Sequence, residues 1–174
     1  NDVQVEPKLQ PLTGEALDGS ANTSDEARLD IKARSFWQRG QIAFFDVRIF
    51  NPFAKSHLNQ KLHNAFVKNE NEKKRFYNQR VIDVEHGSFS PLVFTPYGGC
   101  SRETERFISE LATKLTLKKH LDGRSLKHWL RTKTSFCLIR SAILCVRGSR
   151  SVRAPTVPDI ENIDIVHAVG HISS

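Results

Sequence analysis

Two aspartates interrupt the apolar arms of a predicted hairpin, at positions where a strand normally carries Val or Ile. The hairpin covers residues 28–50 and reads RLDIKARSFWQRGQIAFFDVRIF, with Asp30 in the first arm and Asp46 in the second. In an antiparallel pair, the residue numbers of any two facing residues add up to the same total. A turn centred on Gln38 therefore places Asp30 opposite Asp46. Side chains that face each other directly lie roughly 4.5–5.5 Å apart at Cβ. Two carboxylates at that distance repel unless one takes a proton or a cation lies between them.

A hard divalent cation with oxygen ligands resolves such a conflict, so the two aspartates are candidate ligands of Mg²⁺ or Mn²⁺. Arg48 follows Asp46 by two residues and therefore points to the same face of the strand. Its guanidinium could contact a phosphate, or it could neutralise Asp46 in a structural ion pair. The spacing alone leaves both interpretations of Arg48 open.

A lysine interrupts the apolar stripe of the next predicted element, a helix over residues 56–85. The stripe has intervals of three, four and seven residues and consists of Leu58, Leu62, Phe66, Lys73, Tyr77, Val81 and Val84. An ammonium group on a buried stripe needs a partner. Glu70, one turn earlier, could supply it. Alternatively, Lys73 reaches the two aspartates and orients or deprotonates a metal-bound water.

The elements around the hairpin follow from periodicity and punctuation. Residues 2–9 predict a short strand that Pro7 confines to an edge, and a polar loop follows it. The second hairpin arm is apolar on both faces, as in a central strand. PLVFTP predicts a short buried strand that ends at YGG.

Two further helices are predicted at the C-terminal end. One covers residues 101–119 with Ser101 as its N-cap, and the other covers residues 125–146. The apolar residues that we expect to face inward on the last helix are Trp129, Leu130, Phe136, Cys137, Ile143 and Leu144. The order β, ββ, α, β, α, α predicts an α/β domain with a mixed sheet. Residues 151–174 read as a flexible, basic, Pro-containing tail.

The charge is unevenly distributed along the 174 residues. Residues 1–26 carry six acids and one base, so the remaining residues hold 25 bases and 13 acids, a charge of +12. A basic body of this kind favours a polyanionic partner, most simply nucleic acid.

No run approaches the ~18 apolar residues of a membrane span. The three cysteines form no CxxC pair, which fits a reducing compartment. The chain has no Met and begins with Asn1, so we expect a segment of a longer reading frame.

Several motifs in this order resemble the PD-(D/E)XK nuclease superfamily. They are a strand with Asp, FFDVR, a long helix with EKKRFY, and SFSPLVF ending in YGG. The chain is more closely similar to the restriction-like endonuclease domain that follows the reverse transcriptase in site-specific non-LTR retrotransposons. It is also similar to retroelement-derived reading frames with stretches such as LQPLTGE, SFSPLVF and RSAILCVRGSRS. The resemblance covers residues 1–150 and implies an α/β restriction-endonuclease-like core, a mixed β-sheet flanked by helices, with C-terminal helices added.

The resemblance assigns roles to the hairpin residues. Asp30 matches the first metal-binding aspartate, Asp46 matches the acidic residue of the (D/E)xK motif, and the carbonyl of Val47 completes the metal shell. Arg48 stands where the superfamily usually has Lys, and we count it among the candidate catalytic residues. A further acidic residue of the family's first helix would fall before Asn1.

In the retrotransposon group the catalytic lysine is often displaced onto the following helix, about four residues before a Tyr. Lys73 fits that position relative to Tyr77, with Lys74 as the alternative. The candidate contacts to backbone phosphates, some of which could instead belong to a solvated helix face, are Arg48, Lys74, Arg75, Arg131, Lys133, Arg140 and Arg147.

The implied function is a metal-dependent DNA endonuclease domain of a retroelement that nicks target DNA with Mg²⁺ or Mn²⁺. The implied partners are DNA, or an RNA/DNA hybrid, and a reverse transcriptase in the same polyprotein. We expect no membrane association and a nuclear location. Two alternatives stay open: a catalytically inactive, domesticated module that binds nucleic acid, and a protein-interaction domain whose charge is incidental.

Overall fold

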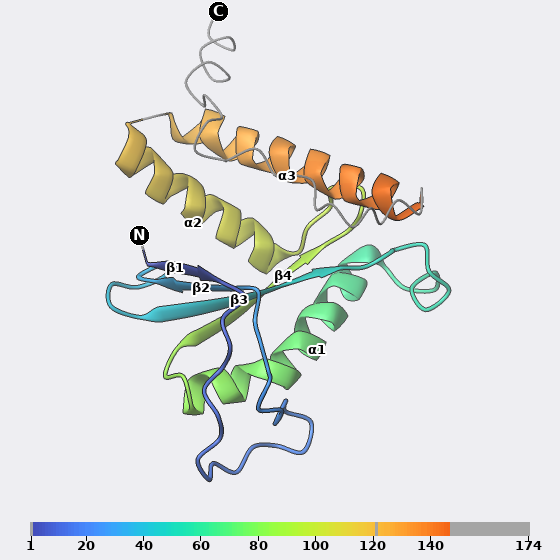
Figure 1. The fold of residues 1–174 in the computed structure, drawn as a ribbon. Coiled ribbons are helices and arrows are strands. Elements are labelled where there is room, and N and C mark those ends of the chain that lie inside the picture. Colours follow the sequence, from blue (N-terminus) through green and yellow to red (C-terminus); the bar gives the residue numbers. More distant parts are fainter. Residues whose placement is uncertain (1, 121, 147–174) are drawn as a thin grey trace, which may run out of the picture. The chain divides into compact units, whose positions relative to one another are not determined.

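The chain forms a mixed α/β fold around a four-stranded sheet (Figure 1). A computed structural model describes residues 2–120 and 122–146. The strands lie in the order β1-β2-β3-β4, and their bounds are Val3–Val5, Ile31–Arg34, Ile42–Ile49 and Ser88–Phe94. β1, β2 and β3 pair antiparallel, whereas β3 and β4 pair parallel. The predicted element order and the mixed sheet are confirmed.

Three helices complete the described residues: α1 (Leu62–Asp83), α2 (Arg102–Lys119) and α3 (Gly123–Val146). The chain divides into two compact units. The first contains all four strands, α1 and α2 up to Glu110, and the second contains the rest of α2 and α3. The predicted tail, residues 151–174, lies outside the described residues.

The hairpin between β2 and β3 has the predicted register. Ile31 pairs with Phe45 and Lys32 pairs with Phe44, so the residue numbers of facing residues add up to the total expected for a turn centred on Gln38. Asp30 directly precedes β2, and its N–H donates to the Phe45 carbonyl at 3.1 Å. The pairing therefore brings Asp30 to the part of β3 that holds Asp46.

β3 has a neighbouring strand on both sides only in its first half, because β2 pairs with residues 42–45 and β4 with residues 43–49. Residues 43–46 are buried, as a strand covered on both faces should be. Val47 and Ile49 are exposed beyond the end of β2, with exposed fractions of 39% and 48%. The prediction of a strand buried on both faces is thus confirmed for the first half of β3 and wrong for the second.

α1 lies along one face of the sheet (Figure 1), and Phe44 of β3 packs with Val81 of α1. One apolar cluster joins Phe44, Val81 and Phe89 to the loop residues Leu9, Ala27 and Leu29. A second joins Phe66 of α1 to Val93 of β4 and to Phe50 and Ala65. Both clusters hold α1 against β3 and β4, and burial of their apolar surface stabilises this packing.

Two predictions about inward-facing residues are wrong. Leu58 and Leu62 are both exposed. Leu58 lies in a series of turns before α1, and Leu62 is the first residue of α1. On α3, Phe136 and Ile143 are exposed, and so are Cys137 and Leu144. The buried positions are Leu126 and Leu138, which lie on one i, i+4 row; α3 is apolar on more than one face, so periodicity did not identify that row.

A fully buried arginine on α1 ties the polar loop of residues 10–26 to the helix. Arg80 Nη1 donates to the carbonyls of Asn22 and Ser24, each at 2.8 Å, and Nη2 donates to the Gln10 carbonyl at 2.9 Å. A buried charge is tolerated where several hydrogen bonds satisfy it. Arg80 thus replaces the apolar contacts that this polar loop cannot make.

Replacing Arg80 with Met should lower the free energy of unfolding by about 3 kcal/mol or more. The apolar stem is kept, but three partly buried hydrogen bonds from a fully buried guanidinium to backbone carbonyls are lost. Urea denaturation of the full chain at neutral pH measures the effect. The matched control, Arg75→Met at an exposed position of the same helix, should change it by about 0.5 kcal/mol or less. Equal effects of the two substitutions would contradict this role of Arg80.

Candidate active site

The centre of the candidate site is an ion pair between β3 and α1. Asp46 is buried on β3, and Lys73 Nζ of α1 lies 2.6 Å from its Oδ2. The lysine therefore reaches Asp46, whereas Glu70 accepts the Glu103 N–H. The Nζ also lies 5.7 Å from the centre of the Tyr77 ring. The structure therefore pairs Lys73 with Asp46, and the predicted role toward a metal-bound water stays a prediction.

Asp30 lies beside this pair at the start of β2. Its Oδ2 accepts the Val47 N–H at 2.5 Å. In an extended strand the N–H and C=O of one residue point to the same side. The carbonyl of Val47 therefore faces the same edge of β3 as the Asp30 carboxylate. Two carboxylates and one backbone carbonyl thus lie near one another where β2 begins.

Burial dominates the electrostatics of Asp46. It raises the pKa of the Asp46 carboxyl, and the neighbouring Asp30 charge raises it further. The hydrogen-bonding and charge effects of Lys73 lower the pKa, but the net shift is upward. Among the described residues, the Lys73 ammonium lies 2.6 Å from the buried Asp46 Oδ2, and no further donor is shown for this oxygen. A buried carboxylate oxygen thus keeps an accepting capacity that its surroundings do not fill.

This donor set fits a hard divalent cation. Such ions prefer carboxylate and carbonyl oxygens, which Asp30, Asp46 and Val47 can supply. Within residues 2–120 and 122–146, no group of three or more His, Cys, Asp or Glu side chains is placed to hold a metal. A cation at the hairpin edge would therefore have two carboxylate side chains and would depend on backbone and water oxygens for the rest.

Arg48 pairs with a residue that the sequence reading missed. Its Nη1 lies 3.1 Å from Glu72 Oε1 on α1, and both side chains are partly exposed. The pair therefore differs from the Asp46–Arg48 ion pair that the spacing left open. Glu72 directly precedes Lys73, so neighbouring positions of α1 contact neighbouring functional positions of β3. That adjacency was readable only after the helix had been placed on the strand.

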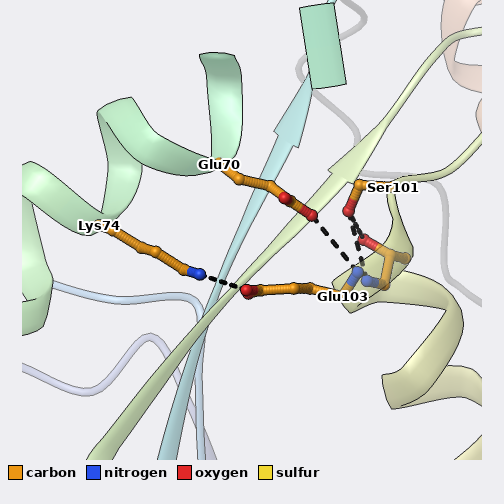
Figure 2. A network of polar contacts seen from close by, with 5 residues as sticks. Glu70, Lys74, Ser101 and Glu103 are labelled. Atoms are coloured by element: carbon orange, nitrogen blue, oxygen red, sulfur yellow. Dashed lines mark hydrogen bonds and ion pairs between the residues drawn. The ribbon is translucent and has the colours of Figure 1, made fainter. Parts of the chain in front are cut away.

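Lys74 points to a different network, shown in Figure 2. It forms an ion pair with Glu103 in the first turn of α2, and the Glu103 N–H donates to Glu70 Oε1 at 3.4 Å. Ser101 Oγ accepts the Thr104 N–H at 3.3 Å, which confirms the predicted N-cap. Lys74 is thus engaged with the N-terminus of α2, whereas Lys73 is engaged with Asp46.

The predicted phosphate contacts are distributed over the two units. Arg75 is exposed on α1, with its guanidinium 5.4 Å from the centre of the Phe76 ring. Arg131 and Arg140 are exposed on α3, and Lys133 Nζ lies 5.0 Å from the centre of the Trp129 ring. Arg147 lies outside the described residues. Arg48 and Lys73 are the cations that the structure brings to the aspartates.

A pocket adjoins the ion pairs in the first unit. It has a volume of about 550 Å³, and it is lined by residues 21–24 of the polar loop and by Arg48, Lys73, Phe76 and Tyr77. We call it the loop pocket. It gives the candidate site a concave, partly cationic surface next to the carboxylates.

The raised pKa of Asp46 predicts a specific dependence of stability on pH. Between the ordinary value of 3.8 and the raised value, the folded chain holds more proton at Asp46 than the unfolded chain. This contribution to stability is complete below 3.8 and is lost as pH rises through the folded pKa. Asp46→Asn removes the titration, so urea denaturation from about pH 3 to pH 6 should show the variant gaining stability relative to the wild type. Asp25→Asn, at an exposed loop position, controls for the lost charge. A difference that moves the other way with pH would contradict the raised pKa.

Comparisons with protein-family models, with curated proteins and with solved structures return no match for this chain. Among the described residues, no helix is long and apolar enough to cross a membrane. The chemistry of the site therefore follows from its own groups: two carboxylates, a lysine and an arginine at one edge of a sheet.

Proposed function

We propose that the chain is a metal-dependent DNA endonuclease domain of a retroelement, with a PD-(D/E)XK-like core. The observation that carries the proposal is the position of Lys73 Nζ, 2.6 Å from Oδ2 of Asp46, a carboxyl whose pKa the Asp30 charge also raises. Two carboxylates can hold a divalent cation, and a neighbouring lysine can orient the attacking water, so these groups suit metal-assisted hydrolysis of a phosphodiester. The strand order and the crossover helix between parallel strands agree with the core that the sequence motifs imply.

Each residue of the site has a role in this reaction. Asp30, Asp46 and the Val47 carbonyl would hold Mg²⁺ or Mn²⁺, which supplies activation of water and stabilisation of phosphoryl charge when bound. Lys73 orients the attacking water or accepts its proton. Arg48, with a fork of donors, holds a non-bridging phosphate oxygen while it keeps its contact with Glu72. The water oxygen bonds to phosphorus and one P–O bond breaks, so a strand is nicked.

The basic residues elsewhere would position the DNA. The chain beyond residue 26 has a charge of +12, and contacts between such residues and phosphates carry no sequence information. As part of this proposal, the chain acts in the nucleus and is joined to a reverse transcriptase in one polyprotein.

A nucleic-acid-binding module without cutting activity is the second candidate. Arg48 at the position where the resembled superfamily usually has Lys favours it, and so does the ion pair that engages Arg48 with Glu72. The two candidates share DNA binding and differ only in hydrolysis.

Asp46→Ala should abolish nicking of supercoiled plasmid in Mg²⁺ or Mn²⁺ and leave DNA affinity nearly unchanged. The substitution removes a proposed metal ligand without touching the basic surface. Gel assays of nicking and fluorescence anisotropy of labelled DNA measure the two properties on the full chain. Binding without cutting in either metal would support the second candidate. Absence of DNA binding at ~50 mM salt would contradict both.

Substitution of the two adjacent lysines should separate their roles. Lys73→Ala should lower the nicking rate by about 10²-fold or more, because the proton-transfer group is lost. Lys74→Ala should leave the nicking rate within a few-fold and mainly lower the midpoint of urea denaturation, because its partner is Glu103. A strong loss of nicking in Lys74→Ala with normal folding would reverse the assignment.

A further inference from the structure

The loop pocket has features that the proposed hydrolysis does not use. It is lined by residues 21–24 of the polar loop and by Phe76 and Tyr77 of α1. Arg48 and Lys73 also line it, so the pocket opens directly onto the ion pairs of the site. Any group bound there would be a near neighbour of a phosphate held by Arg48.

The loop wall is fixed in place by backbone hydrogen bonds. Arg80 Nη1 donates hydrogen bonds to the carbonyls of Asn22 and Ser24. The Asn22 N–H donates to the Phe76 carbonyl at 2.9 Å. The Ser24 N–H donates to Asn22 Oδ1 at 3.0 Å, which fixes the Asn22 amide and leaves its NH₂ group as a donor. A wall with defined donors close to an aromatic ring is preorganised for a flat polar ligand.

Phe76 is an apolar ring on a charged part of the surface. Its exposed fraction is 37%, and it belongs to neither of the two apolar clusters that pack α1 on the sheet. Tyr77, the next residue, does pack against the first of those clusters. The fold therefore uses Tyr77 for packing, whereas Phe76 lines the pocket with part of its ring accessible.

We propose that the loop pocket binds an unpaired nucleotide that flanks the scissile phosphate. The base stacks on Phe76, its edge faces the Asn22 amide, and its phosphate lies toward Arg48. This inference rests on the proposed function, since that function supplies the phosphate at Arg48. Bases of a continuous duplex are stacked and paired, so a base must leave the helix to reach a protein ring. The preferred substrate is therefore DNA that is single-stranded or opened at the cut site.

The test combines binding of a short oligothymidylate with nicking of two substrates. Phe76→Ala and Phe76→Leu should each weaken oligothymidylate binding by roughly tenfold at low salt, because stacking on an aromatic ring is lost. Phe76→Trp should retain it. The control is Ile82→Ala, at an exposed apolar position of the same helix, and it should leave binding unchanged. In Mg²⁺ or Mn²⁺, the wild type should nick a duplex with a central bubble faster than a continuous duplex, and Phe76→Leu should reduce that preference.

The outcomes separate this inference from the nuclease itself. If oligothymidylate binds equally well to the wild type and to folded Phe76→Leu, the nucleotide pocket is wrong, even where Asp46-dependent nicking is observed. If binding depends on Phe76 while neither substrate is cut, the pocket stands and the endonuclease proposal fails. Equal nicking of bubble and continuous duplex by the wild type overturns the proposed substrate preference.

Discussion

The parallel pairing of β3 with β4 is the constraint from which the candidate site follows. Parallel neighbours cannot be joined by a tight turn, so the chain needs a long crossover, here α1. That crossover covers one face of the sheet with Phe66, Val81 and their cluster partners. Residues of β3 on the covered face must then meet α1, and Asp46 and Arg48 lie on that face. The ion pairs to Lys73 and Glu72 are the result.

Buried charge is tolerated at two places for different reasons. Arg80 Nη1 and Nη2 donate to three carbonyl acceptors, although its Nε has no partner shown, and the side chain organises a loop that is too polar to pack by itself. Asp46 has a single ammonium neighbour and a raised pKa, so its ionised form is less well stabilised. Unrelieved electrostatic cost of this kind concentrates at functional sites more often than in purely structural networks. The contrast favours a structural role for Arg80 and a chemical one for Asp46.

The sequence was sufficient for the parts that depend on local pattern. Alternation and the turn predicted the hairpin register, and with it the proximity of Asp30 and Asp46. A lysine on an apolar stripe identified Lys73. Arg80 could not be found in this way, because its partners are backbone carbonyls of a loop distant in sequence. The exposed face of α3 was misread, since a helix that is apolar on several faces does not say which one packs.

The local balance of charge links the proposed cofactor to the proposed substrate. Asp30, Asp46 and Glu72 contribute three negative charges when ionised, whereas Arg48 and Lys73 contribute two positive ones. A phosphodiester that approached these groups alone would meet a slight excess of negative charge, which opposes binding. A divalent cation held by the aspartates reverses the sign and leaves Arg48 free to share its donors with a phosphate oxygen. Metal binding and phosphate binding at this edge are therefore expected to be mutually dependent, whereas the distant basic residues attract DNA in either case.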